Sequence, residues 1–230
     1  MKKKESNDTG VGLLLGLSLG HGVKHFGQSA LSVIGPFLKV SLNLSDVAYG
    51  AIFSASNVAS GLSNIPAGIF SDMYRKKIAW FLALAMLSIA IGYFLLGTIK
   101  TYPIIILAVV LMGFGQSFWH APAFGTLAAR YPNKKGFAIS MHLTGAQIGN
   151  TIGPLIVGGL ISGIVIRSII SFEGFGWEKV SVFMAIPMII TGLLVLVLFK
   201  SAGSESKGNW SFDEYKTRSK GLLKDKIILG

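Results

Sequence analysis

Long apolar stretches alternate with short polar connections along the whole chain. A helix rises about 1.5 Å per residue, so about 20 apolar residues cross the hydrocarbon core of a membrane. The pattern predicts an all-α membrane protein with six transmembrane helices, a polar start at residues 1–9 and a polar tail at residues 200–230. The predicted spans cover approximately residues 10–38, 47–71, 78–98, 103–129, 136–166 and 180–199.

The amino-acid composition also indicates that lipid forms part of the solvent around the protein. The 230 residues are 51% hydrophobic and 13% charged, whereas soluble domains carry about 25% charged residues. The net charge is +11, but the cations cluster between apolar stretches, which indicates topology signals and not nucleic-acid binding. With no cysteine in the sequence, disulfides and thiolate metal sites are excluded. We expect no cofactor and no metal.

The distribution of Lys and Arg predicts the orientation in the membrane. Clusters occur at residues 2–4, 75–77 and 134–135 and along the tail. The alternate connections hold only the isolated cations Lys39, Lys100, Arg167 and Lys179. Because cytoplasmic connections carry the excess of Lys and Arg, both termini are expected to be cytoplasmic in a multi-pass protein of the plasma membrane, a cell inner membrane. The connection at residues 167–179 is then external, with Trp177 at headgroup depth.

The most specific motif follows the second predicted span. It reads Gly-Ile-Phe-Ser-Asp-Met-Tyr-Arg-Lys-Lys at residues 68–77 and resembles the loop that joins the second and third helices of the major facilitator superfamily. A generic cytoplasmic loop would also carry these cations, although the Gly-x3-Asp spacing is less common. Met73 and Arg75 replace the arginine and glycine usual in the family. The residues assigned to this conformational loop motif are Gly68, Ser71, Asp72, Arg75, Lys76 and Lys77.

Two further segments resemble the fosmidomycin-resistance-like, drug–proton antiporter branch of this superfamily. One is Phe-Trp-His-Ala-Pro at residues 118–122, and the other is a G-x3-G-P pattern in the fifth span. Small residues four apart let helix backbones touch, and proline bends a helix; ordinary packing in any bundle would use the same residues. The predicted helix-packing motif consists of Gly145, Gly149, Gly153, Pro154, Gly158 and Gly159.

A weak internal repeat accompanies these motifs. Gly-Gln-Ser at residues 27–29 recurs at residues 115–117. The resemblance implies the N-terminal six-helix half of a transporter, built as a 3+3 inverted repeat, whereas complete family members have twelve spans. The chain is therefore expected to require a C-terminal six-helix half, or less readily to form a homodimer.

Polar residues inside the predicted spans are the candidates for function. His21, Lys24, His25 and Gln28 share one helical face. A cation at the bilayer centre costs about 3 kcal/mol, so Lys24 is expected to face a water-filled cavity or a partner; snorkelling is the alternative. The predicted solute or proton pathway contains His21, Lys24, His25, Gln28, Asn57, Gln116, Trp119, His120, His142 and Gln147.

These residues predict transmembrane transport of a small solute by alternating access. Proton-coupled efflux, as in an antiporter, is the preferred form, because histidine has an unperturbed pKa of about 6.5 and carries protons readily. The alternative is a non-transporting protein, either truncated or a scaffold for another membrane subunit. An enzyme is not expected, since no catalytic set of residues occurs.

Overall fold

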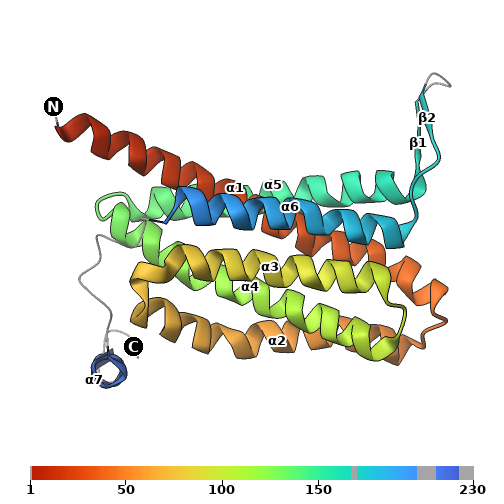
Figure 1. Ribbon diagram of the computed structural model, residues 1–230, viewed down its shortest axis with the longest axis horizontal. Coiled ribbons are helices and arrows are strands. Elements are labelled where there is room, and N and C mark those ends of the chain that lie inside the picture. Colours follow the sequence, from red (N-terminus) through yellow and green to blue (C-terminus); the bar gives the residue numbers. More distant parts are fainter. Residues whose placement is uncertain (1, 167–169, 201–210, 223–230) are drawn as a thin grey trace.

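The computed structural model describes residues 2–166, 170–200 and 211–222. Six long helices lie side by side along the long dimension of the molecule (Figure 1), and a shorter helix follows them. The helices are α1 (Lys2–Ser41), α2 (Asp46–Met73), α3 (Ile78–Thr98), α4 (Tyr102–Arg130), α5 (Lys135–Ser162), α6 (Trp177–Leu198) and α7 (Phe212–Leu222). The chain is thus predominantly helical, as the apolar stretches predicted.

Short polar segments set the helix boundaries. Ser45 caps α2, because its side chain accepts a hydrogen bond from the backbone N–H of Ala48 at 3.2 Å. The 3₁₀ helix η1 (Arg75–Lys77) turns the chain between α2 and α3. Pro103 occupies the first turn of α4, where a missing N–H costs no helical hydrogen bond. The connections that join α1 through α5 are therefore short.

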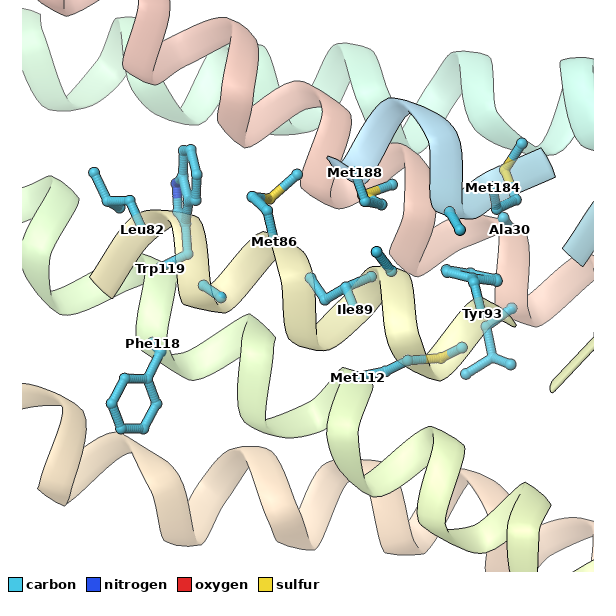
Figure 2. Close-up of a cluster of buried hydrophobic side chains, with 14 of the residues drawn as sticks. Ala30, Leu82, Met86, Ile89, Tyr93, Met112, Phe118, Trp119, Met184 and Met188 are labelled. Atoms are coloured by element: carbon cyan, nitrogen blue, oxygen red, sulfur yellow. The ribbon is translucent and has the colours of Figure 1, made fainter. Parts of the chain in front are cut away.

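Helix pairing within the bundle follows a simple scheme. α1 packs mainly against α5, α2 packs mainly against α4, and α3 lies between α4 and α6. The central core is filled by side chains of α3, α4 and α6, among them Leu82, Met86, Ile89, Met112 and Met188 (Figure 2). These side chains hold α3 at the middle of the bundle.

Glycines bring α1 and α5 into backbone contact. A Cβ added at Gly145 would lie 2.1 Å from the carbonyl oxygen of Ser18, and one at Gly149 would lie 2.1 Å from that of Gly22. A Cβ added at Gly153 would lie 2.0 Å from the hydroxyl of Ser29. The three glycines thus allow a helix separation that no larger residue permits.

The two remaining glycines of the expected packing motif do not face α1. A Cβ at Gly158 would meet nothing within 4 Å, and one at Gly159 would approach only Ile164, at 3.0 Å. Pro154 lies inside α5. The close packing along α5 therefore involves only the first three glycines of the motif.

The structure departs from the predicted spans after the fifth helix. α5 ends at Ser162, because Gly163 adopts a φ of 83°, so the predicted span to residue 166 was four residues too long. The next residues form the strand β1 (Ile164–Ile166), which pairs antiparallel with β2 (Ile170–Phe172). This hairpin was not predicted, since its apolar residues continue the hydrophobic run of the helix.

The start of the chain also differs from expectation. α1 begins at Lys2, inside the start predicted to precede the bundle. Trp177 begins α6 and is buried by protein, and the Nζ of Lys100 lies 5.9 Å from its ring centroid; its position at headgroup depth stays a prediction. The predicted external cation at position 167 and the tail segments 201–210 and 223–230 lie outside the described residues.

Three helical segments among the described residues have the length and hydropathy of a membrane crossing. They are Arg75–Thr98, Tyr102–Arg130 and Gly176–Leu198. The other three long helices, α1, α2 and α5, carry more polar residues along their length. Among these polar residues are most of the candidates for a functional site.

Candidate functional site

The four histidines of the sequence meet at one place in the bundle. His21 and His25 belong to α1, His120 to α4 and His142 to α5. The rings of His21 and His142 stack with centroids 4.0 Å apart, and the ring of His21 meets those of His25 and His120 edge-on at 4.6 and 5.1 Å. We call His21, His25, His120 and His142 the histidine cluster.

Hydrogen bonds fix the orientation of the two rings on α1. His21 Nδ1 donates to the backbone carbonyl of His142 at 3.0 Å, and His25 Nδ1 donates to Oδ1 of Asn150 at 3.3 Å. The amide of Asn150 is oriented by its Nδ2, which donates to Oε1 of Gln147 at 3.3 Å. The Nε2 atoms of His21 and His25 face each other at 3.1 Å.

Lys24 is the charged group of the site. It is fully buried, and its Nζ donates to Nε2 of His120 at 2.9 Å. None of the ten Asp and Glu residues of the sequence occurs within residues 9–45 or 73–172, so no carboxylate belongs to the parts of α1, α4 and α5 that form the site. A buried ammonium group is costly without a counter-charge, so the site is suited to an anion.

Gln28 and Gln116 extend the polar region beyond Lys24. Both line a cavity of about 10 Å³ together with Lys24, which is room for about one water molecule. Gln28 corresponds to Gln116 in the internal sequence repeat. They come from α1 and α4 and meet at the same place.

Three other predicted pathway residues lie apart from the cluster or differ in role. Trp119 is completely buried in the hydrophobic core, and its ring lies so close to Gly20 that an added Cβ there would be 2.5 Å away; its assignment to the pathway stays a prediction. Asn57 is exposed on α2. Gln147 is exposed on α5 and contacts Asn150, not the histidines.

Two residues of the site were not assigned to it from the sequence. One is Asn150, the partner of His25. The other is Phe124, whose ring stacks on that of His120 at a centroid distance of 5.8 Å and meets that of His142 edge-on at 5.4 Å. Phe124 follows His120 by four residues, so helical spacing alone could have indicated this pair.

The loop after α2 forms a second polar feature. Arg75 donates to Asp72 at 3.1 Å, and the Nζ of Lys77 lies 5.9 Å from the ring centroid of Tyr74. Ser71 is buried, whereas a Cβ at Gly68 would meet nothing within 4 Å.

Comparison with known proteins gives the family. The family model of the Major Facilitator Superfamily matches residues 17–229. The chain belongs to the major facilitator superfamily. Its family and relatives are transporters and not enzymes. Together with helices suited to membrane crossing, this membership makes the chain an integral membrane protein.

Curated relatives support the same family. The chain is 27% identical over 154 residues to the fosmidomycin resistance protein of Escherichia coli (strain K12), covering 67% of this chain and 37% of the relative. It is 28% identical to the hexuronate transporter of Bacillus subtilis (strain 168), covering 81% and 40%. It is 26% identical to the phosphoglycerate transporter protein of Salmonella typhimurium, covering 93% and 44%. The chain thus spans less than half the length of these relatives.

Solved structures share the fold at low identity. A bacterial homologue of the human lysosomal transporter Spinster, inward-facing and unoccupied, matches 83% of this chain and 43% of its own with a TM-score of 0.68 and 19% identity. The peptide transporter POT in complex with sulfate matches 96% and 44% with a TM-score of 0.67 and 18% identity. At this identity the likeness concerns the fold alone.

Proposed function

We propose that the chain forms the N-terminal half of a secondary transporter that moves a small anionic solute, with proton-coupled efflux as its mode. The observation that carries the anionic solute is Lys24, a fully buried cation whose hydrogen-bond partner is an imidazole and not a carboxylate. Two relatives are named for hexuronate and phosphoglycerate, which are both anions. An anionic group that binds beside Lys24 would supply the missing counter-charge.

Proton coupling is assigned to the histidine cluster. His21 and His25 pair through their Nε2 atoms, His25 also bonds to Asn150, and His120 bonds to Lys24. The ring of His142 stacks on that of His21, so a proton that enters at one ring alters the charge felt at the others. Imidazole exchanges protons near neutral pH, and no carboxylate occurs in this part of the sequence. The cluster is therefore the group in this chain best suited to couple protons to solute movement.

The 3+3 inverted repeat is supported by the helix pairing. In such a repeat α1, α2 and α3 correspond to α4, α5 and α6. The contact of α1 with α5 then corresponds to that of α4 with α2, and both are principal contacts of the bundle. Gln28 and Gln116, which the repeat relates, line one cavity. We assign the six long helices to six spans with both termini in the cytoplasm of a plasma membrane.

The need for a second half is supported by the open faces of two helices. α2 exposes Leu62 and Ile65, each at 73%, and α5 exposes Leu155 at 73%. Polar groups lie on the same helices, with Asn57 and Asn150 both exposed. A face that mixes apolar and amide groups is better covered by protein than by lipid. We favour a separate C-terminal six-helix half over a homodimer.

Flux measurements test this proposal. Vesicles that contain the chain with a co-expressed C-terminal half are loaded with small organic anions, and efflux is recorded with and without a proton gradient. Lys24→Met is expected to reduce efflux of the transported anion at least tenfold, and Lys24→Arg to keep part of it. Lys39→Met, at the end of α1, is the matched control. Equal efflux by the wild type and the Lys24→Met variant would refute the role of Lys24.

A further inference from the structure

We propose that the imidazoles of His21, His25 and His120 form a binding site for a divalent transition-metal ion of the zinc class. The nitrogen ligands that these three residues offer all lie within 4.8 Å of one another. Neutral imidazole is a preferred ligand of such ions, and three histidines with an open fourth position make a known type of zinc site. The proposal does not depend on which solute the chain transports.

The tautomers of two rings are fixed by their hydrogen bonds. A carbonyl oxygen only accepts, so His21 must carry its proton on Nδ1, which donates to the carbonyl of His142. The same argument places the proton of His25 on Nδ1, because Asn150 presents Oδ1 to it while its Nδ2 donates to Gln147. In the neutral rings, both Nε2 atoms therefore carry a lone pair.

These two lone pairs point toward one another. The Nε2 atoms of His21 and His25 are 3.1 Å apart, and two lone pairs at this distance repel unless a cation lies between them. Ligands at 2.0–2.1 Å from a tetrahedral zinc ion are about 3.4 Å apart, so the observed separation requires little adjustment. Either a shared proton or a metal ion satisfies the pair.

His120 supplies the third ligand, and it distinguishes a bound metal ion from a proton shared by His21 and His25. Its Nδ1 is buried and has no hydrogen-bond partner among the described residues, and its Nε2 is held by Lys24. Because Lys24 donates to Nε2, this atom carries the lone pair of the ring. A proton shared by His21 and His25 makes no use of that lone pair, whereas a metal ion uses all three rings once Lys24 releases His120. The side chain of His25 is only partly buried, which leaves a path for an ion to enter.

The hydrogen-bond partners of the ligand rings also match those of a metal site. A metal-bound histidine usually donates its other N–H to a carbonyl or carboxylate oxygen, which orients the ring. His21 and His25 both do so, through His142 and Asn150. Such partners alter metal affinity by about 10- to 100-fold.

The chain suits a direct binding measurement. It contains no cysteine and no histidine outside the cluster, so an ion that binds through imidazole can bind only there. The purified chain, carrying an affinity tag without histidine, is dialysed in detergent against Zn²⁺, and the bound metal is measured by mass spectrometry. Co²⁺ replaces Zn²⁺ for visible absorption, which reports nitrogen ligation. We expect one ion per chain with a Kd in the micromolar range or below.

Substitutions test the ligand set. His25→Gln and His120→Gln are each expected to weaken binding at least 100-fold. Asn150→Leu should weaken binding by about 10- to 100-fold, and Asn150→Asp, which still accepts from His25, should not. His142→Phe is the matched control, because it keeps the backbone carbonyl and an aromatic ring against His21, and it should bind as the wild type does.

The variant Lys24→Met tests the site by a gain of metal affinity instead of a loss. It removes a positive charge and frees His120, so the affinity for Zn²⁺ should rise, which a misfolded variant cannot produce. The same change is expected to reduce anion transport, so the two proposals fail in distinguishable ways. The metal proposal is overturned if the wild type binds no Zn²⁺ at 100-fold excess, as a shared proton would predict, or if His25→Gln and His120→Gln bind Zn²⁺ unchanged.

Discussion

The contact between α1 and α5 gives a prediction that the structure makes quantitative. Gly149→Ala places a Cβ 2.1 Å from the carbonyl oxygen of Gly22, whereas real contacts of this kind essentially never fall below 3.0 Å. The two backbones must therefore separate by about 0.9 Å. Overpacking of this kind costs about 1–3 kcal/mol, and in a membrane no hydrophobic force between helices offsets it.

The same helix provides the control for this prediction. Gly158 also lies inside α5, but a Cβ there would meet nothing within 4 Å. Replacing glycine by alanine in a helix interior stabilises it by about 1 kcal/mol. Gly158→Ala should therefore stabilise the protein, and Gly149→Ala should destabilise it relative to Gly158→Ala by about 1–3 kcal/mol.

Reversible unfolding in mixed micelles measures both variants. The protein is titrated with sodium dodecyl sulfate, and the loss of helix contacts is followed by tryptophan fluorescence and circular dichroism. The free energy of unfolding of each variant is compared with that of the wild type at the same detergent composition. If Gly149→Ala is as stable as Gly158→Ala, the close contact of α5 with α1 at Gly149 is not part of the folded protein.

Two further predictions concern the core and the topology. Tyr93→Phe removes the hydrogen bond from the buried hydroxyl to the carbonyl of Gly27 and should lower the free energy of unfolding by about 1 kcal/mol, measured in the same titration; no change would contradict the bond. In the variants Lys39→Cys and Lys76→Cys, the introduced cysteines should react with a membrane-impermeant thiol reagent from opposite sides of the membrane. The cysteine at position 39 should react in intact cells, and the one at position 76 only after lysis. Labelling of Lys76 in intact cells would reverse the proposed orientation.

Helical spacing predicted part of the site correctly. His21, Lys24 and His25 were placed on one face of the first helix, and they do face the histidines of α4 and α5. Spacing could not reveal that His142 stacks on His21, because the pairing of α1 with α5 depends on tertiary packing. Likewise, the glycines of α5 indicated a close helix contact, but not which helix makes it.

The errors have local physical causes. Trp119 and His120 are adjacent on α4, so their side chains are about 100° apart around the helix and point to different neighbours. The sequence did not decide between them, and the structure places Trp119 in the core. The hairpin at Ile164–Ile166 was missed because its β-branched residues prolong the apolar run of α5. The glycine that ends the helix, Gly163, is one of many glycines in this region.

Equilibrium binding of anions to the purified protein tests the role of Lys24 most directly. The chain, with its proposed C-terminal half, is titrated calorimetrically with small carboxylates, phosphates and phosphonates, and the titration is repeated with Lys24→Met. A charge-assisted hydrogen bond contributes about 1.5–3 kcal/mol, so the variant should bind the preferred anion about 10- to 100-fold more weakly. Equal affinity of both proteins for every anion that binds would contradict the account.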